Sequence, residues 1–61
     1  MNIAVLRRRA GYTQTDLAKL VNVDQSSVSK WENGVIRPAR KLREPLAKAL
    51  NCTVDELMKE D

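Results

Sequence analysis

Apolar residues recur every three or four positions along most of the chain, the spacing that places them on one face of an α-helix. No segment has a convincing strand pattern. The pattern therefore predicts an all-α protein with five short helices, over about residues 2–10, 13–21, 24–33, 41–50 and 53–58.

Residues that start and stop helices stand at the borders of these segments. Thr13 with Asp16 three positions later resembles a capping box, and Thr53 with Glu56 repeats that spacing. Asp24 is expected to cap the third helix. The expected stops are residues that tolerate a left-handed backbone: Gly11, Asn22, Gly34 and Asn51.

Pro45 conflicts with a regular fourth helix. Proline lacks an amide proton and clashes with the preceding turn, so it is tolerated only in the first turn of a helix. Either this helix starts late, near Leu42, or it is kinked. Residues 35–40 are expected to form a loop, because Pro38 biases Arg37 towards an extended backbone.

The second and third helices are joined by a link of about four residues, counting the residues that cap them, and each has its own cap. Such a pair is a helix-turn-helix, over about residues 14–33, and its second helix typically lies in the DNA major groove. Val28 and Trp31 can share the inner face of that helix, with Val23 filling the gap between the two. Trp31 is therefore expected to pack on the body of the domain, although an exposed aromatic could stack on a base.

The 61 residues suffice for one small domain, residues 1–61, and the net charge is +3. One cysteine and no histidine exclude an internal disulfide and a Cys/His zinc set, and we expect a reducing cytoplasm and a buried, inert Cys52. No run approaches the roughly 18 apolar residues of a membrane span. Basic residues cluster at Arg7, Arg8 and Arg9 and again at Arg37, Arg40, Lys41 and Arg43, and acidic ones at Asp55, Glu56, Glu60 and Asp61. This distribution favours a surface that faces a polyanion, with two ordinary solvated faces as the alternative.

The stretch QTDLAKLVNVDQSSVSKWENG, Gln14 to Gly34, resembles the phage Cro and repressor type of helix-turn-helix protein, also called the xenobiotic-response-element family. LAKALNCTVDELM looks like the fourth and fifth helices of that family, so the resemblance covers essentially the whole chain. The matching positions are Thr13, Gln14, Leu17, Ala18, Val23, Val28, Trp31, Glu32, Asn33, Gly34 and Pro38. The resemblance implies a compact, five-helix, lambda-repressor-like DNA-binding domain.

The resemblance also implies which side chains meet double-stranded DNA. Base contacts are expected from the third helix, at Gln25, Ser26 and Lys30, with Ser29 as a secondary candidate for base or phosphate. Glutamine can pair with adenine, lysine with guanine, and serine with several bases. Phosphate contacts are expected at Gln14, Asn33, Arg37, Arg40 and Ser27, where Ser27 has packing as an equal alternative.

Arg7 and Glu32 both lie beside apolar stripes, where a single charge would be costly. Similar proteins pair an arginine of the first helix with the glutamate after the third. We therefore expect a partly buried Arg7–Glu32 ion pair, with two exposed charges as the alternative.

These features lead to the hypothesis of a sequence-specific transcriptional regulator, a Cro-like repressor that binds a pseudo-palindromic operator as a homodimer. The dimer contact is expected at Val54, Leu57 and Met58 of the C-terminal helices. The alternative is a protein-interaction module, or an antitoxin-type partner binder, with the same fold. An enzyme is a poor fit, and no metal, cofactor, small-molecule ligand or membrane is expected.

Overall fold

The computed structural model describes residues 1–59, and within them the chain forms five α-helices and no strand. The predicted all-α architecture is confirmed. Glu60 and Asp61, part of the expected acidic cluster and of the expected domain 1–61, lie outside the described residues. The helices are α1 (Ile3–Ala10), α2 (Gln14–Leu20), α3 (Gln25–Glu32), α4 (Arg40–Ala49) and α5 (Val54–Met58).

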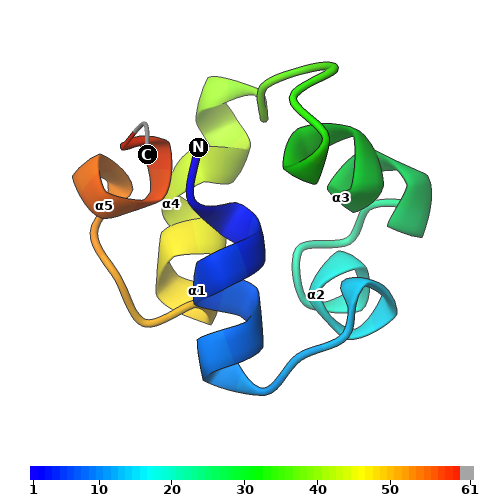
Figure 1. The fold of residues 1–61 in the computed structure, drawn as a ribbon, viewed down its shortest axis with the longest axis horizontal. Coiled ribbons are helices and arrows are strands. Elements are labelled where there is room, and N and C mark those ends of the chain that lie inside the picture. The colour runs from blue at the N-terminus through cyan, green and yellow to red at the C-terminus, as the bar shows by residue number, and fades with distance from the viewer. Residues whose placement is uncertain (60–61) are drawn as a thin grey trace.

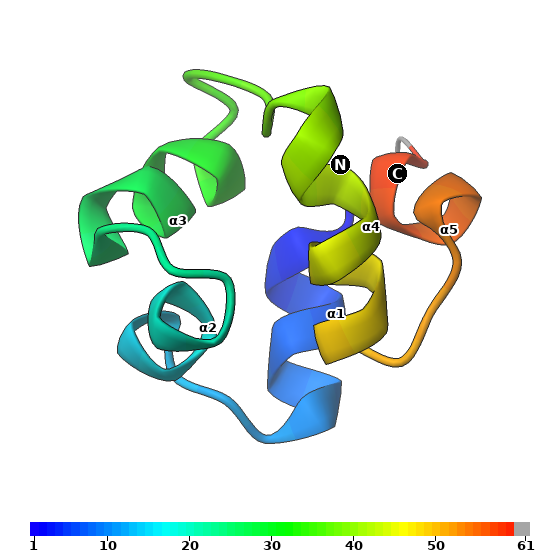
Figure 2. The ribbon, with the colours of Figure 1, turned by 180° about the vertical axis from the view of Figure 1, so that it is seen from behind.

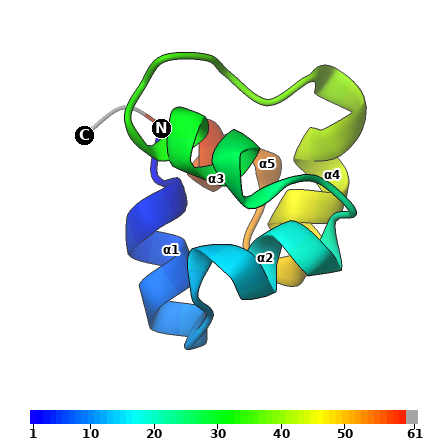
Figure 3. The same ribbon diagram turned by 90° about the vertical axis from the view of Figure 1, so that its right-hand side faces the viewer.

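The helices enclose one apolar core. Figure 1 shows α2 and α3 on one side of the molecule and α5 on the other, with α1 and α4 between them, and Figure 2 shows the same order from behind. Viewed from the α2–α3 side, α1 and α4 stand to either side of that pair (Figure 3). The buried members of the core are Ile3, Leu6, Leu17, Ala18, Val21, Val28, Trp31, Leu46, Leu50 and Leu57.

The first four helices end alike, because a left-handed residue follows each of them as predicted. The positive φ angles belong to Gly11 (83°), Asn22 (60°), Gly34 (73°) and Asn51 (56°). After α2, for example, the amide of Asn22 donates to the carbonyl of Lys19 at 3.3 Å, and that of Val23 donates to Ala18 at 2.9 Å. This is a Schellman motif, which satisfies carbonyls that the helix leaves free. It also turns Val23 inward, where it packs against the core as expected.

The helix starts agree only in part with the sequence. Thr13 and Asp16 form the predicted capping box, with both bonds at 3.0 Å. Thr53 accepts from the amide of Glu56, but the return contact joins the two side chains at 3.5 Å, so that box is incomplete. The Asp24 side chain makes no cap bond, so that prediction was wrong. The amide of Ser27, a usual target of such a cap, instead donates to the backbone carbonyl of Asp24 at 3.0 Å.

Pro45 lies inside α4, five residues after the first helical residue, Arg40. Of the two alternatives, the late start near Leu42 is therefore wrong. The proline ring removes the bond that the Lys41 carbonyl would otherwise accept. The preceding loop is anchored by Pro38, whose side chain is fully buried and whose carbonyl accepts from Nε of Arg43 at 3.2 Å.

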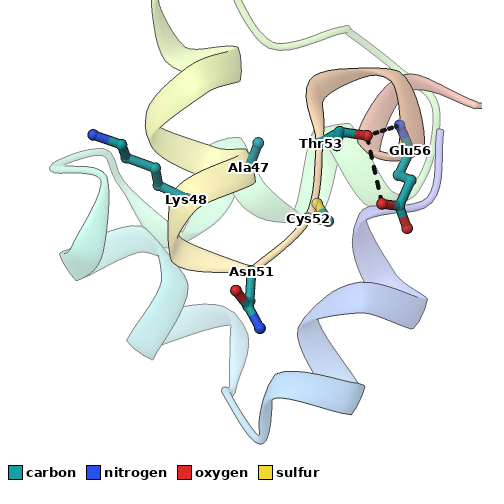
Figure 4. A pocket seen from close by; sticks show the side chains of 6 residues that line it. All are labelled: Ala47, Lys48, Asn51, Cys52, Thr53 and Glu56. Atoms are coloured by element: carbon teal, nitrogen blue, oxygen red, sulfur yellow. Dashed lines mark hydrogen bonds between the residues drawn. The ribbon is translucent and has the colours of Figure 1, made fainter.

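A shallow pocket lies at the turn between α4 and α5 (Figure 4). Figure 1 shows this turn on the side of the molecule away from α3. Cys52 lines the pocket and is half-buried. Burial raises the pKa of the Cys52 thiol, and the nearby charge of Glu56 adds to this, so the thiol stays protonated. Separately, none of the described helices is long and apolar enough to cross a bilayer.

Candidate nucleic-acid interface

The two faces of α3 have opposite characters. Val28 and Trp31 are buried, with exposed fractions of 0% and 3%, so Trp31 packs inward as expected. Gln25, Ser26 and Lys30 are exposed. Because the helix repeats every 3.6 residues, burying positions 28 and 31 turns 26 and 30 outward, while Gln25 stands at the exposed first turn. The outward face therefore carries amide, hydroxyl and ammonium groups.

A short link holds α3 beside α2. Ala18, only 3% exposed, is small enough to let the two helices approach, and Leu17 beside it is fully buried. The left-handed Asn22 then changes the direction of the chain within the four residues of the link. Figure 3 shows α2 and α3 as an adjacent pair at one surface of the molecule. This is the geometry of a helix-turn-helix.

The expected ion pair joins α1 to the end of α3. Arg7 Nε lies 2.6 Å from Glu32 Oε2, and the two side chains are 11% and 8% exposed. A second guanidinium nitrogen donates to Glu32 Oε1 at 3.3 Å, and a third donates to the Tyr12 carbonyl at 2.8 Å. The pair therefore fixes the C-terminal end of α3 to the body of the domain.

The carboxylate of Glu32 is held in its charged form. Burial acts to raise its pKa, but hydrogen bonds from Arg7 and Gln14 and the charges of Arg7 and Arg8 outweigh it, so the pKa of Glu32 lies below its ordinary value. The hydrogen bond to Glu32 raises the pKa of Arg7 above its already high value. Both groups are consequently ionised at neutral pH.

Gln14 connects this ion pair to the outer face of α3. Its Nε2 donates to Glu32 Oε1 at 3.0 Å, and its Oε1 accepts from Gln25 Nε2 at 2.6 Å. The family resemblance implied a phosphate contact for Gln14 and did not indicate these bonds. Their partners lie 18 and 11 positions away in sequence. No local pattern marks such pairs, because only the packing of α2 against α3 brings them together.

Of the remaining predicted contacts, Ser27 lies in the first turn of α3, and the others lie in the C-terminal half of α3 or beyond it. The side-chain amide of Asn33 donates to Ser29 Oγ at 3.4 Å. Ser29 and Ser27 are half-buried, and Asn33 is exposed. Arg37 is exposed on the loop that runs from α3 to α4, and Arg40 is exposed as the first residue of α4. The sequence thus places two cations on the segment directly after α3.

Comparisons with known proteins agree with this geometry. The family model described as helix-turn-helix matches residues 3–57. A curated relative, the competence pilus inhibition repressor of Acinetobacter baylyi, is 38% identical over 55 residues, which cover 90% of this chain. The aligned region is 50% of that relative, so this chain spans about half its length.

Proposed function

This chain belongs to the helix-turn-helix family, of the Cro and repressor type, and we propose that it is a DNA-binding transcriptional regulator. In this proposal it binds a pseudo-palindromic operator as a homodimer and represses transcription by blocking polymerase. The name of the relative, a repressor, supports repression over activation.

One observation carries the proposal: α3 has an exposed polar face and, opposite it, a buried apolar face. The buried face packs on the domain and so fixes the position of the helix. A helix of this kind fits the major groove, where base edges offer hydrogen-bond partners. Gln25, Ser26 and Lys30 would contact bases, with Ser29 in a secondary role. Phosphate contacts are proposed for Gln14, Ser27, Asn33, Arg37 and Arg40.

The proposed dimer would read two half-sites about 34 Å apart. The sequence suggested a contact through Val54, Leu57 and Met58. Leu57 is fully buried within the single chain and has no surface to offer a partner. Val54 and Met58 remain half-buried and could contribute to a dimer contact.

A second candidate function has one observation in its favour. Val35 and Ile36, on the loop between α3 and α4, are 67% and 46% exposed. Side chains of this kind beside a polar helix face suit a protein contact. A protein-interaction module would bind without a base preference.

The test is selection from a random pool of duplexes at near-physiological salt, with sequencing of the bound fraction. We expect a two-fold symmetric motif. Gln25→Ala or Lys30→Ala should weaken binding to it by about fivefold to 150-fold, the worth of one bidentate base contact. Lys48→Ala, which removes an exposed lysine on the pocket side, is the matched control. Weak, sequence-blind retention that disappears with added salt would reject the regulator and leave only generic binding by a basic surface, and the search would then move to protein partners.

A further inference from the structure

Four side chains from three helices form one hydrogen-bonded series that ends at the outer face of α3. Arg7 donates to Glu32, Gln14 donates to Glu32, and Gln25 donates to Gln14. The series begins at the part-buried ion pair and ends at an exposed side chain. We refer to these four residues as the relay.

Glu32 determines which group donates and which accepts in each hydrogen bond of the relay. An ionised carboxylate can only accept hydrogen bonds, whereas an amide group can both donate and accept. Gln14 must therefore present its nitrogen to Glu32, which leaves its oxygen for Gln25. Gln25 must in turn present its nitrogen to that oxygen. Turning either amide around would place two acceptors, or two donors, against each other.

This arrangement of donors and acceptors determines what Gln25 can offer to DNA. One N–H of its amide is already donated to Gln14, so one N–H and the carbonyl oxygen remain. Adenine displays one acceptor and one donor in the major groove, which these two groups match. Guanine displays two acceptors, which would need two donors.

We propose that Glu32 is a positioning residue for sequence readout, which acts through Gln14 to make Gln25 select adenine over guanine. This inference rests on the proposed function, because it requires that Gln25 meets a base.

Replacing Glu32 by glutamine should allow the relay to reverse. The oxygen of the new amide would take the shorter contact, at the position 2.6 Å from Arg7 Nε, and the weaker 3.3 Å bond from the second guanidinium nitrogen would be lost. Its nitrogen would then face Gln14, where Gln14 would present its oxygen instead. Gln25 would turn in response and offer both of its N–H groups to a base. Guanine should then bind better than it does to the original protein.

The experiment measures affinity for operator duplexes that differ only at the base pair whose preference Gln25→Ala abolishes. The unaltered protein should prefer adenine over guanine there by about tenfold or more, within the range of one bidentate contact. In Glu32→Gln the ratio should fall below about threefold, with the guanine duplex gaining affinity relative to the other duplexes. Preferences at all other positions should stay unchanged.

Two further variants separate readout from folding. Gln14→Leu breaks the relay but keeps the Arg7–Glu32 pair, and it should also lower the adenine-to-guanine ratio, because Gln25 regains a second N–H. Glu44→Gln makes the same chemical change at an exposed position on α4 and should leave the ratio intact. If Glu32→Gln fails to fold, the adenine-to-guanine ratio of Gln14→Leu still tests the inference.

Three results would overturn the inference. The ratio could stay constant in Glu32→Gln and Gln14→Leu while affinity falls equally for every duplex, which is the behaviour of a purely structural residue. The position governed by Gln25 could prefer guanine or a pyrimidine. Finally, the unaltered protein could show no base preference at all, in which case the proposed function fails first and the inference fails with it.

Discussion

At the scale of single residues, Glu32 is a side chain on which hydrogen bonds from two other helices converge. It accepts hydrogen bonds from α1 and from α2 while standing at the end of α3. A nearly buried carboxylate is costly unless such partners are present. The same bonds that hold the charge also join three helices, so losing one partner leaves the others with unsatisfied groups.

Removing Arg7 should therefore destabilise the fold. We expect Arg7→Met to lower the free energy of unfolding by about 3 kcal/mol or more, because it strands the buried charge of Glu32. Urea denaturation followed by circular dichroism measures this. The double variant Arg7→Met/Glu32→Met should lose less than the sum of the two single changes.

Arg9→Met is the matched control for this prediction, since Arg9 is exposed on the same helix. It should change the free energy of unfolding by no more than about 0.5 kcal/mol. Equal effects of Arg7→Met and Arg9→Met would mean that the ion pair contributes nothing to stability.

The lowered pKa of Glu32 predicts how stability depends on pH. The ordinary value for this carboxyl is 4.5, and the folded value lies below it. The folded state thus prefers the ionised form, and this contribution is fully present above pH 4.5. It is lost as the pH falls through the folded value. Asp16, whose pKa is lowered by its hydrogen bonds with Thr13, acts in the same direction.

Measuring the free energy of unfolding in steps from pH 7 to pH 3 tests this dependence. Glu32→Gln should be less stable than the unaltered protein at pH 7 and should lose less stability on acidification. If the two profiles run parallel below pH 4.5, Glu32 is not the group responsible.

At the scale of secondary-structure elements, the helix ends were the most predictable features. The stops at Gly11, Asn22, Gly34 and Asn51 follow from backbone chemistry that each residue carries by itself. The capping role of Asp24 failed, because a backbone carbonyl took the amide that its side chain was expected to bind. Caps depend on competing partners, whereas a left-handed stop depends mainly on the residue.

The helix α4 tolerates a proline where local preference opposes one. Pro45 is exposed, so its replacement by alanine should lose little packing and restore the bond to the Lys41 carbonyl. We expect Pro45→Ala to raise the free energy of unfolding by about 1–3 kcal/mol. Thermal and urea denaturation would both reveal the gain.

The other proline of the chain, Pro38, provides a control of opposite sign. It is fully buried, so Pro38→Ala should destabilise the protein by removing packed apolar surface. A loss of stability in Pro45→Ala would show that the proline ring makes packing interactions that outweigh the missing hydrogen bond.

At the scale of the whole molecule, the effect of the net charge of +3 depends on where the basic side chains lie. If Arg40 contacts a phosphate, its removal releases fewer counterions on binding. Arg40→Ala should then flatten the plot of log affinity against log salt by about 0.9 for each phosphate that is no longer neutralised, with base preferences unchanged. Lys48→Ala, at the pocket between α4 and α5, should leave the slope as it was. Equal slopes for both variants would remove Arg40 from the interface.

The sequence alone predicted the fold well and the hydrogen bonds within the candidate site poorly. Five helices, the buried Val28 and Trp31, and the Arg7–Glu32 pair all follow from spacing or from family resemblance. The bonds of Gln14 to Glu32 and Gln25 do not, because they depend on the angle between α2 and α3. Local chemistry determines where helices stop, and tertiary packing determines which polar side chains meet.

The buried Trp31 is the only tryptophan in the chain, and it lies on the face of α3 turned away from the proposed DNA contact. Its fluorescence therefore reports whether α3 is seated on the body of the domain, without any added dye. Water reaching the indole would shift the emission to longer wavelengths. A variant of the outer face that binds DNA poorly but keeps the original spectrum is altered only in its binding surface. A shifted spectrum means that α3 no longer packs on the body of the domain.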